Sequence, residues 1–221
     1  MTFDATTIKM LLEGIRDTLY MVLASSAISY ILGIPLGILL VVTDKDGIRP
    51  FPVFQKVLGL AINLLRSVPF IILLIMMLPC TRFLVGTLIG SRAVIPPLVV
   101  SATPYIARMV ESSFREVDSG VIEAAQSMGA TTGQIVWKVL LPEAKPSLLI
   151  GAAISITTIL GYTTMAGFVG GGGLGAIAIN HGYYRYEFGT MLVTVVLLVV
   201  IVQIIQELFM RFAKATDRRI R

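Results

Sequence analysis

The stretch that decides the fold is residues 18–43, TLYMVLASSAISYILGIPLGILLVVT, which contains no charged side chain. A transmembrane helix needs about 20 consecutive, mostly apolar residues to cross the hydrocarbon core of a bilayer, and this stretch exceeds that length. The whole chain has the same character, because 56% of its 221 residues are hydrophobic and only 14% are charged. A typical soluble domain carries about 25% charged residues. The sequence therefore predicts an all-α integral membrane protein.

Four further stretches predict spans, which gives five: residues 18–43, 57–80, 92–110, 147–170 and 189–210. The second is long enough only if its helix begins before Arg66, near Val57. The third contains three prolines, so we expect it to bend and to find partners inside a bundle for the carbonyl groups that the prolines free. We expect the five spans to form one membrane domain that covers residues 1–221.

Basic residues are distributed unequally between the two sides that five spans define. Residues 43–56, 108–146 and 210–221 share one side and hold 12 Lys and Arg, whereas the other side holds five. The side that is richer in Lys and Arg is usually cytoplasmic. The sequence therefore predicts an external N-terminus, an internal C-terminus and a cytoplasmic location for residues 108–146. The net charge of +5 thus first reports orientation and does not call for a nucleic-acid partner.

Residues 118–142 form a polar island between two apolar stretches. Asp118 or Ser119 is placed to cap a short helix that runs to about Met128. Gly129 is placed to end that helix in the left-handed conformation, which glycine adopts without a steric penalty. The pattern predicts a first surface helix over about ten residues.

A second helix is expected to follow directly. Thr131 and Gln134 have the spacing of a capping box, and Pro142 is expected to end the helix. In the first helix, the small Ala124–Ala125 pair would let another protein surface approach the backbone closely. The segment is therefore predicted to be a helix–turn–helix that docks a soluble partner. The alternative is a solvated loop whose amphipathic helices lie on the lipid surface.

The same segment resembles the EAA motif of ABC-importer permease subunits. It reads EAA from Glu123, three residues, Gly129, nine residues and then VLLP from Val139, where the family usually has Ile. In that family the motif forms the coupling helix that sits in a cleft of the ATP-hydrolysing subunit. The resemblance implies that the residues that couple the chain to an ATPase are Glu123, Ala124, Ala125, Met128 and Gly129.

The resemblance extends over nearly the whole chain. Four runs are similar to the permease of methionine importers: LLRSVPFIILLIMMLP (64–79), ATPYIARMVESSF (102–114), SMGATTGQIVWKVLLPEAKP (127–146) and GYTTMAGFVGGGGLG (161–175). The first run also resembles polar amino-acid permeases, so import of another amino acid stays open. The resemblance implies a homodimer in the bacterial inner membrane that imports methionine, both L- and D-. The partners implied are two copies of an ATP-binding ABC subunit, an extracytoplasmic substrate-binding protein and membrane lipid, but no nucleic acid.

Two groups of residues are candidates for the translocation path or its gate: Arg66, Ser67 and Pro69, and Tyr162, Thr163, Thr164 and Met165. An intramembrane charge is costly and implies a compensating role, so Arg66 is placed near the path or near a helix break before Pro69. The alternative is that Arg66 extends to the cytoplasmic interface from a helix that begins near Ser67. Met165 is either a gate for an amphipathic solute or a filler of gaps in the core.

Other chemistry is not indicated. Residues 170–175 match G-x-G-x-x-G, but they follow a membrane span and lack the acidic residue expected about 20 positions on, so we expect irregular backbone at a span end. No phosphate-binding G-x-x-x-x-G-K-[ST] occurs, and His181 has no metal-ligand companions in sequence. We therefore predict no catalytic residues, no cofactor and no metal, with ATP hydrolysis in a partner. A membrane scaffold that anchors a soluble complex without moving a solute is the alternative.

Overall fold

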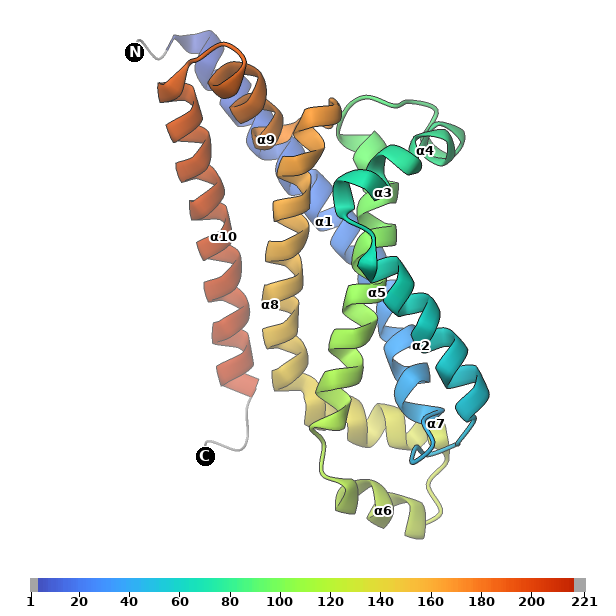
Figure 1. Ribbon diagram of the computed structural model, residues 1–221. Helices are drawn as coiled ribbons and strands as arrows, with labels where there is room; N and C mark the ends of the chain where they lie inside the picture. The colour runs from blue at the N-terminus through green and yellow to red at the C-terminus, as the bar shows by residue number, and fades with distance from the viewer. Residues whose placement is uncertain (1–3, 217–221) are drawn as a thin grey trace. The chain divides into compact units, whose positions relative to one another are not determined.

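The computed structural model describes residues 4–216 and is built from helices over that range (Figure 1). They are α1 (Ala5–Val42), α2 (Pro52–Ser67), α3 (Phe70–Met76), α4 (Leu78–Val85), α5 (Ser91–Arg115), α6 (Ser119–Ser127), α7 (Thr132–Ile135), α8 (Leu141–Ala166), α9 (Gly173–Ile177) and α10 (Phe188–Thr216). Two π-helical turns, η1 (Val136–Leu140) and η3 (Ala178–Tyr183), and one 3-10 turn, η2 (Gly167–Val169), complete the order. The all-α class is confirmed.

Within the described residues, four helices are long and apolar enough to cross a membrane. They are α1, α5, the helix Thr132–Val169 that contains α8, and α10. The helices α2 and α3 meet this criterion only together, and the chain bends by 98° between them. Counting this bent pair as one span gives five candidate spans, which agrees with the predicted number.

The second span differs from its predicted form. Its helix does begin before Arg66, but it starts at Pro52 and breaks after Ser67, so residues 57–80 are not one helix. Proline suits the first turn of a helix, where its missing N–H costs nothing. Pro69 disfavours a helical conformation at the preceding residue, which explains the break. Because α2 begins about 14 residues before Arg66, the alternative of a helix that starts near Ser67 is wrong.

The other predicted spans are longer in the structure. α1 begins at Ala5, well before residue 18, and α5 is assigned as one helix across its three prolines. The described chain forms two compact units. Unit 1 combines the chain up to Ile28 with Val68–Ala102 and Ile156–Gln206, and unit 2 combines Ser29–Ser67, Thr103–Ser155 and the chain from Glu207.

Unit 1 has its core between the first part of α1, α9 and α10. Leu11, Leu174 and Ile177 form a buried cluster, and the Thr18 hydroxyl accepts a hydrogen bond from the Leu174 N–H at 2.8 Å. The chain from the end of α8 to the first residue of α9 has left-handed glycines at Gly170, Gly172 and Gly173, with φ between 75° and 80°. The predicted irregular backbone at this span end is confirmed.

Unit 2 packs the second part of α1 against α2 and α5. Leu40, Ile62 and Ala107 form its buried cluster. Gly33 and Gly37 let α1 approach α5 closely, because an added Cβ would lie within 2.7 Å of atoms of α5 at either position. Glycines four residues apart permit such contact between helices in a membrane. Unit 2 also holds α6, α7 and η1, the segment that the sequence singles out.

Candidate functional site

The first helix of the polar island, α6, has the ends that the sequence predicts. Asp118 is its N-cap, and the carboxylate accepts a hydrogen bond from the Gly120 N–H at 2.7 Å. At the other end Gly129 has φ 77°, and the N–H of Ala130 bonds to the carbonyl of Ala125 at 3.1 Å. This is a Schellman motif, which satisfies carbonyl groups at the end of a helix. Both predicted caps are confirmed.

The second helix begins as predicted and ends elsewhere. Thr131 and Gln134 form the capping box, in which the Gln134 side chain accepts from the Thr131 N–H at 2.8 Å. Pro142 does not end the helix, so that prediction is wrong: the chain is helical from Thr132 to Val169.

The π-helical turn η1 explains why the helix passes Pro142. In this turn the Leu141 N–H bonds to the Val136 carbonyl, five residues earlier. A proline removes one amide donor and crowds the carbonyl four residues before it. A wider turn directly before the proline relieves this crowding, because its hydrogen bonds already span one residue more than those of an α-helix.

The segment presents apolar side chains to its surroundings. Among the predicted coupling residues, Glu123, Ala124, Met128 and Gly129 are exposed, whereas Ala125 is buried against its own chain. Met128 is 82% exposed, and Trp137, which the sequence analysis did not single out, is 72% exposed. Large exposed aromatic residues often anchor protein interfaces. The signal for Trp137 was present in the sequence, as a tryptophan in the polar island outside the expected spans.

A hollow of about 290 Å³ separates α6 from the loop between α1 and α2. Glu123 of α6 lines this hollow, so its carboxylate is at the boundary between the segment and the loop. The hollow also receives acidic side chains from the loop and the last residue of α5; its charged and polar lining comprises Asp44, Asp46, Arg115, Ser119, Glu123 and Gln126.

A charged network lies directly before the polar island. Glu111, which is 6% exposed, accepts hydrogen bonds from Arg108 at 2.6 Å and from Arg115 at 2.9 Å. Arg115 also donates to Asp44 at 2.6 Å, and Arg108 donates to the Gly59 carbonyl at 2.9 Å. A buried carboxylate is stable only when such partners compensate its lost hydration. The network thus ties α5 to α2 and to the loop after α1.

The sequence analysis missed this network. Arg108, Glu111 and Arg115 recur at spacings of three and four residues, which places them on one face of a helix, so part of it was visible. Its partners, Asp44 and Gly59, come from other parts of the chain and could not be paired with it by spacing.

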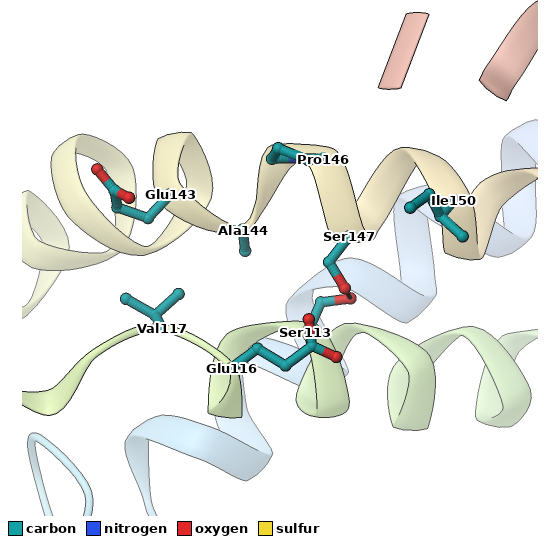
Figure 2. A pocket seen from close by; sticks show the side chains of 8 residues that line it. All are labelled: Ser113, Glu116, Val117, Glu143, Ala144, Pro146, Ser147 and Ile150. Carbon is teal, nitrogen blue, oxygen red and sulfur yellow. Dashed lines mark hydrogen bonds between the residues drawn. The ribbon is translucent and has the colours of Figure 1, made fainter. Parts of the chain in front are cut away.

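The polar island joins α5 and α8 beside a second hollow, of about 330 Å³ (Figure 2). Glu116 and Val117 line it at the end of α5, and Glu143 and Pro146 line it at the start of α8. Figure 2 shows the Ser113 and Ser147 side chains pointing toward each other, and their hydroxyl groups lie 3.0 Å apart in a hydrogen bond.

Close packing continues this contact along the two helices. An added Cβ at Gly151 would lie 2.2 Å from the Met109 Sδ, so α8 and α5 approach each other closely there. The two helices that carry the polar island are therefore bound together where they enter it.

The path candidates fall in both units, and each set has its own surroundings. In unit 2 Arg66 is exposed at the end of α2, and its guanidinium lies 5.9 Å from the centre of the Tyr105 ring. The neighbouring Ser67 hydroxyl donates to the Asn63 carbonyl at 2.8 Å. Arg66 thus has an aromatic partner, and the break that follows α2 lies directly before Pro69.

In unit 1 the candidates surround the end of α8. The Tyr162 ring stacks on Phe70, which follows Pro69, with ring centres 4.6 Å apart. Thr163 and Thr164 donate to carbonyl groups of their own helix, at 2.7 and 2.6 Å, so these hydroxyl protons are already used. Met165 is 46% exposed. The roles of these residues in a path or gate stay predictions.

These features define a class of protein: a multi-pass helical membrane protein with a rigidly capped polar segment between two of its spans. The chain belongs to the family described as binding-protein-dependent transport system inner membrane component, whose model matches residues 18–221. It is thus the inner-membrane component of a transport system and spans the membrane several times.

Individual relatives narrow the comparison. The chain is 47% identical over 210 residues to a probable D-methionine transport system permease protein, MetI, from Vibrio cholerae, covering 95% of this chain and 93% of that one. It is 41% identical to the methionine import system permease protein MetP of Bacillus subtilis, covering 82% of each chain. Its fold is similar to a chain of the MetNI methionine ABC transporter in an inward-facing conformation, with a TM-score of 0.96, 44% identity and coverage of 98% of this chain and 100% of that one.

Proposed function

We propose that the chain is the membrane-spanning permease subunit of an ATP-driven importer of methionine, and that it accepts both the L- and the D-form. The observation that carries the proposal is the capped, exposed helix α6 in a chain that is similar over 95% of its length to a methionine permease. The chain itself is not an enzyme. Hydrolysis of ATP takes place in a separate subunit, and this chain needs no cofactor of its own.

The proposed assembly has two copies of this chain, two ATP-binding ABC subunits and an extracytoplasmic substrate-binding protein. Five spans are few for a closed path, so a path along the two-fold axis of a homodimer is expected. Most of α10 is exposed in the isolated chain, which leaves it free to contact lipid. The unequal distribution of Lys and Arg supports an external N-terminus and an internal C-terminus, although residues 1–3 and 217–221 lie outside the described range.

The proposed mechanism is alternating access. ATP closes the two ATPase subunits on each other, and their clefts carry along the coupling residues Glu123, Ala124, Ala125, Met128 and Gly129. The network around Glu111 and the contact of α5 with α8 brace the ends of the two helices that flank α6, because each link is a short hydrogen bond or a close packing contact. The motion of α6 is thereby transmitted to the spans as rigid-body motion.

The first experiment is uptake of labelled methionine into proteoliposomes that contain this chain with its ATPase and its binding protein. Uptake that requires ATP and is competed only by methionine-like solutes supports the proposal. If another amino acid enters and methionine does not, the chain is still an importer subunit, but the proposed substrate is wrong. If the chain recruits the ATPase and ATP is hydrolysed, but no solute enters, the alternative of a membrane scaffold would be favoured.

The coupling role has its own test. We expect Glu123→Arg or Gly129→Asp to leave the protein folded and inserted, and to uncouple ATP hydrolysis from uptake. Both positions are exposed. An added Cβ at Gly129 meets no atom within 4 Å, but Gly129 has φ 77°, so Gly129→Asp also strains the end of α6. Glu123→Arg is therefore the variant whose damage falls on the docking surface alone. The measurement is the ratio of methionine imported to ATP hydrolysed. Normal uptake by both variants would contradict the assignment of α6 as the coupling helix.

A further inference from the structure

Arg66 lies at the end of α2, in the candidate span that α2 and α3 form, and has no acidic partner in the part of the chain that the structure describes. Within residues 4–216 no carboxylate lies within salt-bridge distance of its guanidinium, which lies 5.9 Å from the centre of the Tyr105 ring. We propose that Arg66, held by Tyr105, is the site that takes the carboxylate of the transported amino acid during translocation. This inference rests on the proposed function and assigns the substrate group that the path recognises.

The pair lies next to the charged network along both helices, because Tyr105 is three residues before Arg108 and Arg66 is seven residues after Gly59, whose carbonyl accepts from Arg108. Arg66 lies about 14 residues into α2, or roughly 20 Å of helix, and Tyr105 lies about 10 residues before the end of α5, or roughly 15 Å. Because α2 and α3 together form a candidate span and α5 forms another, both residues belong to stretches that the sequence places in the membrane. A cation in a span is costly unless it is fully compensated, and the ring and the helix end carry no full negative charge, so an anionic ligand that arrives and leaves is favoured.

The geometry leaves the guanidinium able to bind that ligand. A cation within about 6 Å of the centre of an aromatic ring is attracted by the electrons of its face, and at 5.9 Å Arg66 meets this condition. The ring faces one side of the group without using an N–H donor. Arginine presents its donors in a planar fork that matches a carboxylate bidentately. Since Arg66 is exposed in the single chain, its fork is open to a solute.

The neighbouring polar groups do not compete for this role. The Ser67 hydroxyl donates to the Asn63 carbonyl, so its proton is engaged within the helix end. The break after Ser67 also ends the α2 backbone here, and a cation at a helix C-terminus is favourably placed. The helix end therefore offsets part of the cost of placing the cation here.

The first test measures maximal uptake with saturating binding protein. We expect Arg66→Ala to lower the maximal rate about tenfold or more, since a charged bidentate contact in a dry path is lost. Arg66→Lys retains part of the rate. Tyr105→Phe keeps the ring and remains close to the wild type, whereas Tyr105→Leu loses about threefold. The matched control is Arg211→Ala, which breaks an exposed pair with Glu207 and leaves uptake unchanged.

The second test locates the ligand without relying on activity. The purified complex of permease and ATPase is irradiated with photo-methionine, a diazirine analogue, and the labelled peptides are identified by mass spectrometry. We expect label on peptides of α2 and α5 near Arg66 and Tyr105. Methionine competes with this label, methioninol, which lacks the carboxylate, does not, and Arg66→Ala abolishes it.

Each other outcome overturns the inference. Equal competition by methioninol, label that persists in Arg66→Ala, or wild-type uptake by Arg66→Ala would each remove the carboxylate role. Loss of co-purified ATPase or of the dimer in Arg66→Ala would show that the cation pairs with another subunit. A defect that changes with the anionic lipid content of the vesicles would show a lipid phosphate instead. If the wild-type protein imports no methionine, the proposed function itself is wrong. If the wild type imports methionine and Arg66→Ala does so equally well, only the proposed carboxylate site is wrong.

Discussion

The charged network of unit 2 and the glycine turn of unit 1 both lie where the chain leaves its regular spans, and they are held in opposite ways. In the network, Glu111 binds Arg108 and Arg115 through hydrogen bonds of 2.6 to 2.9 Å. In the glycine turn, residues 167–175, the backbone itself is the contact surface: an added Cβ at Gly175 would lie 2.4 Å from the Thr164 Cα.

The difference shows how each region fails when it is changed. A network of charges stabilises only as a whole, because removal of one member leaves the others buried without a partner. A glycine contact tolerates no added atom, because the opposing atoms are backbone that does not move aside. We therefore expect the network to be sensitive to loss of charge and the glycine turn to be sensitive to gain of volume.

The largest effect is expected for Glu111→Gln. The amide keeps the shape of the side chain and removes the charge that Arg108 and Arg115 share, which costs about 3 kcal/mol, at the low end for a buried pair because Arg115 is partly exposed. The measurement is the thermal stability of the purified protein in detergent, read beside methionine uptake.

Glu207→Gln is the matched control, because Glu207 pairs with Arg211 at the same spacing on an exposed helix surface. Such an exposed pair contributes little to stability. Equal losses of stability in the two variants would contradict the structural role of the buried network.

The next effect is expected for Gly175→Ala. One methyl group is forced against the Thr164 backbone, and overpacking of this kind costs about 1–3 kcal/mol. The control is Gly161→Ala in the same helix as Thr164, where an added Cβ meets no atom within 4 Å. That substitution should maintain or raise the melting temperature, because alanine favours a helix over glycine. Equal melting temperatures for the two variants would show that the glycine turn yields to added volume.

The two regions also differ in how far the sequence predicts them. Runs of glycine at a span end indicate irregular backbone without further information, and the structure confirms it. Likewise, the caps of α6 depend on Asp118 and Gly129, which act on backbone within a few residues, so local chemistry suffices. The network could not be predicted, since Arg115 meets Asp44 across 71 positions and Arg108 meets Gly59 across 49.

Two prolines, Pro69 and Pro142, also show how far a local rule predicts the structure. Pro69 breaks the second span, which agrees with the local rule, and the break was foreseen as one explanation for Arg66. The same local rule predicts that Pro142 ends its helix, but the helix continues because a π-helical turn precedes the proline. Leu140 of that turn is fully buried, and a sequence pattern does not report which distant residues bury it.

The smallest loss of stability is expected for Asp118→Ala, which removes the N-cap of α6, the helix that follows the charged network. Asp118→Ala removes the carboxylate that accepts from the Gly120 N–H, and loss of an N-cap costs about 1 kcal/mol. Because this bond lies at the entry of α6, the cost falls on the order of the coupling helix. Hydrogen exchange of the α6 amides should become faster, and fewer methionine molecules should enter for each ATP hydrolysed. Asp118→Asn retains a capping acceptor and should match the wild type in both measurements. Faster exchange in α6 without any loss of coupling would show that the ATPase cleft orders the helix by itself, and that the cap matters only before docking.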